Sequence, residues 1–208
     1  PVGVAVIGAG NWGKNHVRVY ATMPEAALLY CCDLDENRLN AISRQYSGLR
    51  LTADYRHVLD DPGVRAVIVA TPAPQHFSMV KEALLAGKDV LVEKPLCIEM
   101  AQGEELAQLA EREGRILMVG HLLIYHPAVQ KMKEILQSGE LGKVFYAYSQ
   151  RVNLGTIRQD ESALWSFAPH DVSVLLHLFE DVPIKISAQG ASYITPGRED
   201  VVFLTLEF

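Results

Sequence analysis

Apolar runs and amphipathic stretches alternate along the first 120 residues. Short, almost continuous apolar runs are typical of strands buried on both faces, and the stretches between them have the periodicity of helices. The pattern predicts strands at 2–7, 27–33, 66–70, 89–92 and 116–119. It predicts helices at about 13–22, 35–46, 54–60, 76–86 and 99–113. This alternation indicates a parallel sheet covered by helices on both faces.

After Gly120 the pattern changes, which predicts one domain at 1–120 and a second at 121–208. The second contains expected helices at 127–137 and 169–179 and expected strands at 143–152, 184–193 and 201–208. Alternating strands such as 143–152, with Tyr146 and Tyr148 on one face, favour an open, mainly antiparallel sheet in an α+β domain. Three strands make a thin sheet, so we expect the native chain to continue beyond Phe208.

A glycine-rich motif, Gly8-Ala9-Gly10-Asn11-Trp12-Gly13, joins the first predicted strand to the first predicted helix. In the dinucleotide-binding fingerprint, Gly8 would allow the tight turn and Gly10 the approach of a pyrophosphate. Gly13 would allow close packing of helix on strand. The helix N-terminus that follows would attract the phosphates. The motif predicts a Rossmann-type, doubly wound α/β domain that binds a dinucleotide through these residues, including Asn11 and Trp12.

Asp33 ends the second predicted strand, about twenty residues after the last glycine of the motif. A carboxylate there can accept hydrogen bonds from a ribose 2′-hydroxyl and would repel a 2′-phosphate, which favours NAD over NADP. The alternative is that Asp33 only caps the helix that follows.

Composition and charge exclude several classes of function. The apolar fraction of 49% and charged fraction of 21% are those of an ordinary globular protein. A formal net charge of -6 offers no electrostatic footprint for nucleic acid. No apolar run approaches the roughly 18 to 20 residues of a membrane span, and no signal peptide is visible. We interpret Cys31, Cys32 and Cys97 as reduced thiols of a cytoplasmic protein, and no spacing suggests a metal site.

Two clusters could carry acid–base chemistry. Lys94, in Glu93-Lys94-Pro95, follows a predicted strand at the carboxyl end of the sheet and could donate a hydrogen bond to a substrate hydroxyl. A solvent-exposed lysine is the alternative.

His170 follows Pro169, which suits a first helical position, so we expect His170 in the first turn of a helix. There the helix dipole would keep the imidazole neutral and able to act as a base. Asp171 would then be stabilised at the same helix end.

Further polar residues could line the same region. Thr71, Pro72 and His76 lie in or next to a loop at a strand's carboxyl end and, like Glu93 after the next strand, could border the cofactor. Arg151, Asn153 and Arg158 surround a glycine-containing loop and could clamp a phosphate or carboxylate, although such a run is usually a solvated loop.

The glycine motif, Thr71-Pro72, Glu93-Lys94-Pro95 and His170-Asp171 together resemble the Gfo/Idh/MocA oxidoreductase family over the whole chain. The resemblance implies a Rossmann domain followed by a domain that covers the substrate and forms a homodimer or homotetramer. It also implies oxidation of a sugar or cyclitol carbinol with bound NAD, with Lys94 and His170 as catalytic and substrate-binding residues. Many members place an Asp four residues before the histidine, where this chain has Ser166.

The stretch from Arg151 to Asp171, with Trp165, resembles members that oxidise carbon 3 of UDP-N-acetylamino sugars or their uronates for surface-polysaccharide synthesis. That resemblance implies substrate contacts from Arg151, Asn153, Arg158, Trp165, His170 and Asp171. The alternatives are a dehydrogenase of a free sugar or inositol and a non-catalytic sensor that binds NAD.

Overall fold

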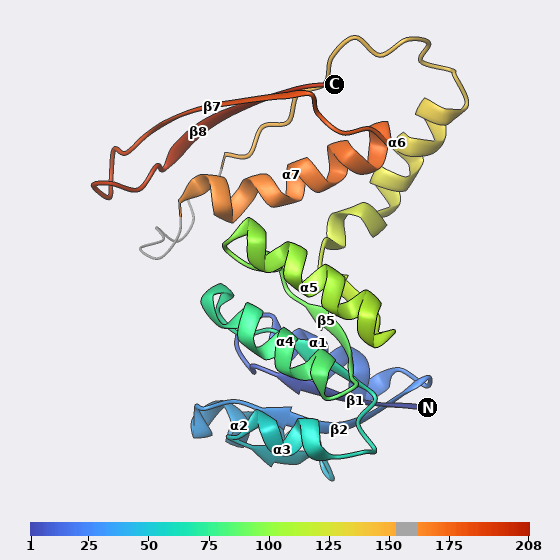
Figure 1. Ribbon diagram of the computed structural model, residues 1–208, viewed down its shortest axis with the longest axis vertical. Coiled ribbons are helices and arrows are strands. Elements are labelled where there is room, and N and C mark those ends of the chain that lie inside the picture. Colours follow the sequence, from blue (N-terminus) through green and yellow to red (C-terminus); the bar gives the residue numbers. More distant parts are fainter. Residues whose placement is uncertain (153–161) are drawn as a thin grey trace. The chain divides into compact units, whose positions relative to one another are not determined.

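The computed structural model describes residues 1–152 and 162–208 (Figure 1). Contacts between Cα atoms divide the chain into two compact units, Pro1–Gly120 and His121–Phe208. Asn153 and Arg158, both predicted to bind substrate, lie outside the described residues.

The first unit, all of whose residues are described, contains a six-stranded parallel sheet in the order β3-β2-β1-β4-β5-β6. Its strands are β1 (Val2–Ile7), β2 (Ala26–Cys32), β3 (Arg50–Thr52), β4 (Ala66–Val69), β5 (Asp89–Val92) and β6 (Leu117–Val119). Its helices are α1 (Gly13–Thr22), α2 (Glu36–Ser43), α3 (Tyr55–Asp60), α4 (His76–Leu85) and α5 (Met100–Glu113), with a short 3₁₀ turn, η1 (Ala73–Gln75). This strand order is that of a dinucleotide-binding fold, and it confirms the predicted fold class.

Alternate residues of β1 face two separate cores. Val4 and Val6 pack with residues of α1 and α2, whereas Ala5 and Ile7 pack with residues of α3, α4 and α5. Side chains that alternate along a strand point to opposite faces, so a continuous apolar strand supports helices on both. The sheet is therefore covered on both faces, as the sequence predicts.

The second unit contains helices joined to a small sheet. Its elements are η2 (Leu122–Tyr125), α6 (Pro127–Gln137), α7 (Ala163–Phe179), β7 (Lys185–Ala191) and β8 (Val201–Glu207). β7 and β8 pair antiparallel, with Lys185 opposite Glu207 and Ala191 opposite Val201. No helix in the described part of the chain has the length and apolar character needed to cross a membrane.

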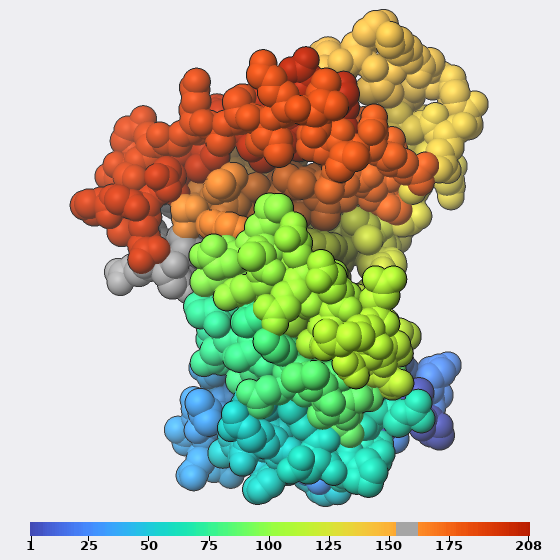
Figure 2. Space-filling model, viewed as in Figure 1, coloured from blue at the N-terminus to red at the C-terminus, as the bar shows by residue number. Residues whose placement is uncertain are grey.

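The strand predicted at 143–152 is absent, which corrects the sequence analysis. In the described part of the second unit, β7 and β8 pair only with each other, so this segment has no neighbouring strand to complete its hydrogen bonds. Tyr146 and Tyr148 are exposed, and the segment forms part of the protruding yellow edge in Figure 2. The alternation of apolar and polar residues suits a strand, but a strand is stable only when a neighbouring strand pairs with it.

Helix α7 begins at Ala163 and not at Pro169 as predicted. Three of the six helical residues before the proline, Ala163, Leu164 and Ala168, are good helix formers. The Ala163 N–H at the helix start donates to the Glu199 carbonyl oxygen at 2.8 Å. Pro169 consequently lies inside the helix, at the cost of one backbone hydrogen bond.

Candidate cofactor and catalytic site

The glycine loop, residues 8–13, connects β1 to α1 at the carboxyl edge of the sheet. Gly8 has a φ of 97°, and a Cβ atom there would lie 2.6 Å from the Ala70 carbonyl oxygen. A Cβ atom on Gly13 would lie 1.7 Å from the Gly8 carbonyl oxygen, so the helix can pack on the turn only with glycine at this position. At Gly10 the nearest atom to such a Cβ is Arg38 Nη1, at 3.8 Å. Gly10 is therefore free of internal crowding, and its open face is available to a ligand.

The start of α1 is suited to an anion. Trp12 precedes the helix and its side chain makes no capping hydrogen bond to it. The N–H groups of the first helical turn and the positive end of the helix dipole attract phosphate. Trp12 itself is 52% exposed, and Asn11 beside it is exposed too.

Asp33 fastens the glycine loop to the end of β2. Its Oδ2 accepts a hydrogen bond from the Ala9 N–H at 2.6 Å, and its Oδ1 accepts one from the Asp35 N–H at 2.8 Å. Arg38 Nη1 lies 3.4 Å from the same Oδ2. The cap of α2 is Asp35, which accepts a hydrogen bond from the Asn37 N–H. Asp33 therefore has a role apart from helix capping, next to where a ribose would meet the loop.

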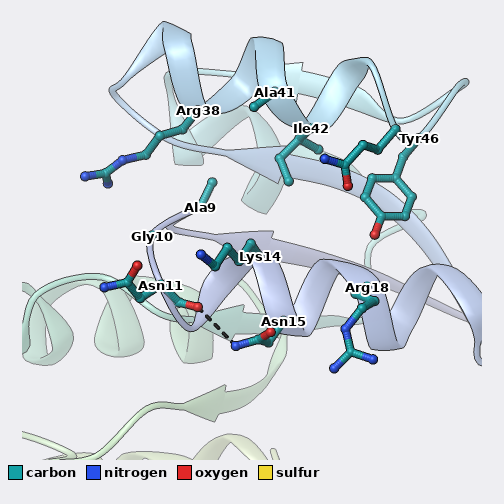
Figure 3. Close-up of a pocket in the computed structure, with 11 residues that line it drawn as sticks. Ala9, Gly10, Asn11, Lys14, Asn15, Arg18, Arg38, Ala41, Ile42 and Tyr46 are labelled. Atoms are coloured by element: carbon teal, nitrogen blue, oxygen red, sulfur yellow. Dashed lines mark hydrogen bonds between the residues drawn. The ribbon is translucent and has the colours of Figure 1, made fainter.

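A groove of about 490 Å³ runs between α1 and α2 from the glycine loop (Figure 3). Lys14, Arg18 and Arg38 contribute three cations to its wall, and no carboxylate lines it. The remaining lining residues are Ala9, Gly10, Asn11, Asn15, Ala41, Ile42, Gln45 and Tyr46. The open glycine, the helix start and these cations fit the anionic adenosine half of a dinucleotide.

The segment Glu93-Lys94-Pro95 follows β5. The ends of β1, β4 and β5 lie at one edge of the sheet, because Ile7 pairs with Val69 and Val69 with Val92. Glu93 Oε1 lies 2.8 Å from Nε2 of His16, which projects from α1. The sequence analysis did not single out His16. Its position one helical turn after Gly13 was the sequence feature that could have placed it near the glycine loop.

His76 supports two loops from behind. Its ring is 1% exposed, with Nε2 2.8 Å from the Thr71 carbonyl oxygen and Nδ1 2.7 Å from the Pro95 carbonyl oxygen. The Thr71 hydroxyl donates to the Met79 sulfur at 3.6 Å. The His76 ring is therefore engaged with the backbone of two loops. It holds in place the Thr71-Pro72 loop.

In the second unit, α7 carries His170, Asp171 and Trp165. Because α7 starts at Ala163, His170 is not in its first turn, and the predicted neutralisation by the helix dipole does not apply. Asp171 Oδ2 accepts a hydrogen bond from Nε of Arg151 at 2.6 Å, and its Oδ1 accepts one from the Ser149 hydroxyl at 2.7 Å. Asp171 thus orients Arg151.

The chain matches two family descriptions. Residues 2–121 match the oxidoreductase family with an NAD-binding Rossmann fold, GFO_IDH_MocA, and residues 129–208 match the GFO/IDH/MocA C-terminal domain.

The chain is also similar to individual proteins. It is 32% identical to a scyllo-inositol 2-dehydrogenase (NAD(+)) of Bacillus subtilis over 68% of this chain and 42% of the relative. It is 28% identical to an inositol 2-dehydrogenase 2 of Saccharopolyspora erythraea, over 98% of this chain and 62% of the relative. A crystal structure of GenD2 from gentamicin A biosynthesis in complex with NAD has 27% identity and a TM-score of 0.86, and the match covers 100% of this chain and 62% of that one. The chain thus spans less than two thirds of the length of these proteins.

Proposed function

The chain belongs to the Gfo/Idh/MocA family of oxidoreductases, and on that premise we propose that it oxidises a secondary hydroxyl of a cyclitol or sugar with NAD. One observation carries the proposal. The glycine loop, held by the hydrogen bond from Ala9 to Asp33, and the segment that bears Lys94 lie at the same edge of the sheet in the NAD-binding domain. Similarity to two inositol dehydrogenases supports the substrate class.

Lys94 and His170 are the proposed catalytic residues, the roles that the family resemblance gives them. When bound, NAD supplies the ring that accepts a hydride from the carbinol carbon. The Lys94 ammonium donates a hydrogen bond to the reacting hydroxyl and stabilises negative charge on its oxygen. The imidazole of His170 takes the hydroxyl proton, which suits a side chain that exchanges protons near neutral pH.

A second candidate substrate is a UDP-N-acetylamino sugar or its uronate, oxidised at carbon 3 for polysaccharide synthesis. The observation in its favour is Arg151, whose Nε donates to the Asp171 carboxylate on α7, while the Ser149 hydroxyl donates to the other oxygen of that carboxylate. A fixed guanidinium is suited to a diphosphate or a uronate carboxylate. Trp165, on the same helix, would offer an aromatic face to the sugar.

Absorbance at 340 nm after addition of NAD and one substrate at a time tests both candidates. We expect a rise with myo-inositol or scyllo-inositol. A rise with UDP-N-acetylglucosamine or its glucuronate alone, inhibited by UDP, would establish the second candidate instead.

Variants then test the roles. Lys94→Ala and His170→Ala should each lower kcat by about 10²-fold or more, as expected for loss of an acid–base group. Lys131→Ala, which removes an exposed lysine paired with Glu134, is the matched control. Tight NAD binding without turnover on any polyol or nucleotide sugar would contradict the enzyme function and support a sensor.

A further inference from the structure

Lys94 lies between two residues that are each held by a histidine. Glu93 contacts His16 through its side chain, and Pro95 contacts His76 through its backbone carbonyl. We propose that His16 and His76 are positioning residues that together fix Lys94 for its reaction. The role of Lys94 in this inference rests on the proposed function. The contacts of His16 and His76 are independent of it.

The contact of His76 joins two loops that are separate in sequence. Its Nδ1 lies 2.7 Å from the Pro95 carbonyl oxygen and its Nε2 2.8 Å from the Thr71 carbonyl oxygen. β4 and β5, which these loops follow, are neighbours in the sheet. The ring therefore sets the distance between the loop after β4 and the backbone immediately after Lys94.

Both partners of the His76 ring are backbone carbonyl oxygens. A carbonyl oxygen only accepts hydrogen bonds, and a neutral imidazole has one N–H and one lone pair. The ring nitrogen that carries the proton donates to its carbonyl oxygen, and the other nitrogen lies close to the second carbonyl oxygen, so the ring is held between the two loops.

His16 holds the other neighbour of Lys94. Its Nε2 lies 2.8 Å from Glu93 Oε1, and both side chains are largely buried, at 20% and 12% exposure. Gly120 leaves room for the carboxylate, since a Cβ atom there would lie 3.3 Å from Glu93 Oε2. The Glu93 N–H also donates to the Val69 carbonyl oxygen at 2.9 Å. Glu93 is thereby fixed through its side chain and its backbone.

The two histidines act from opposite faces of the sheet. His16 belongs to α1, which packs in the core of Val4 and Val6, and His76 belongs to α4, which packs in the core of Ala5 and Ile7. A tether from each face leaves the residue between them little freedom to shift along or across the sheet. Misplacement of a reacting group by about 1 Å can cost on the order of 10² in rate, so such a clamp matters for catalysis.

The first test needs no activity. Side-chain ¹⁵N–¹H correlation spectra of histidine-labelled intact protein at neutral pH distinguish protonated from bare ring nitrogens, with His16→Gln and His76→Gln used for assignment. We expect the ring N–H protons of His76 and His16 to exchange with solvent much more slowly than those of His57, because they are held in buried hydrogen bonds. Exchange as fast as that of His57 would overturn the contacts, and with them the clamp. Exposed His57 serves as the reference ring.

The second test is a double-mutant cycle between His76 and Lys94. We expect His76→Phe to lower kcat by about 10- to 100-fold with a smaller change in the KM for NAD, and His76→Gln, which keeps one donor, to lose less. In a Lys94→Ala background the His76 change should lower kcat no further, because its effect passes through Lys94. An equal fall in both backgrounds would overturn the proposal. The same cycle applies to His16→Gln.

Controls separate the clamp from folding and from the proposed function. His57→Gln should leave kcat unchanged, and thermal unfolding confirms that each variant folds. Full turnover by Lys94→Ala would disprove the proposed role of Lys94 and the clamp's catalytic purpose together. If Lys94→Ala loses turnover but the effects of the two substitutions are additive in the double-mutant cycle, the clamp is disproved and the proposed role of Lys94 stands.

Discussion

The Asp33 carboxylate accepts a hydrogen bond from the Ala9 N–H at 2.6 Å, so the residue that follows β2 holds the loop that follows β1. Arg38 is within 3.4 Å of the same oxygen. The acid therefore fixes the glycine loop and also contacts the Arg38 guanidinium.

Replacing Asp33 should alter cofactor choice. Asp33→Ser removes a charge-assisted hydrogen bond and frees Arg38 to meet a 2′-phosphate. We expect NADH affinity to fall by about tenfold or more and NADPH affinity to rise, as measured by fluorescence titration. Asp54→Asn, which changes a cap on α3, is the matched control. An unchanged ratio of the two dissociation constants would show that Asp33 does not select the cofactor.

Two glycines of the loop should respond differently to alanine. Gly13→Ala places a Cβ atom 1.7 Å from the Gly8 oxygen and should lower the free energy of unfolding by about 1–3 kcal/mol or more. Gly10→Ala meets no atom closer than 3.8 Å, so it should unfold like wild type yet bind NAD more weakly. Calorimetric unfolding and NAD titration measure the two effects. Wild-type NAD affinity in Gly10→Ala would exclude close approach of the cofactor there.

Trp12 should report cofactor binding. It precedes α1 and is 52% exposed, and the other tryptophan, Trp165, is on α7 in the second unit. NAD bound at the glycine loop should quench Trp12 emission. Trp12→Phe should abolish most of the quenching and Trp165→Phe should preserve it. The reverse result would place the quenching tryptophan in the second unit.

The three cysteines should differ in reactivity with pH. Burial raises the pKa of both Cys31 and Cys32 to about 12, because desolvation disfavours the thiolate. Burial also raises the pKa of Cys97, but its side chain is partly accessible. Iodoacetamide at pH 8 should label Cys97 first, and labelling of the other two in the folded protein should rise only as the pH approaches their pKa. Mass spectrometry of the labelled peptides checks this order, and equal labelling at pH 8 would contradict it.

Local sterics explain why the first unit could be predicted well. Gly8 and Gly13 meet constraints from their own turn, and buried strands such as β1 have the apolar pattern that two covered faces require. β3 was not predicted because three residues are too few for a periodic signal.

Features that depend on distant residues could not be predicted in the same way. The alternation at 143–152 resembles a strand, but pairing needs a neighbour that no local pattern reveals. Pro169 suggested a helix start, whereas the residues before it extend α7. The contact of His16 with Glu93 spans 77 residues of chain, so only the folded sheet brings the two together.

The groove between α1 and α2 gives this chain an uneven electrostatic field. The chain as a whole carries a formal charge of -6, yet Lys14, Arg18 and Arg38 gather beside the glycine loop. Such a cluster attracts the phosphates of a dinucleotide although the net charge of the chain is negative. That attraction guides encounter over a distance of about 10 Å at moderate salt, so association should slow as ionic strength rises even where the bound contacts stay intact.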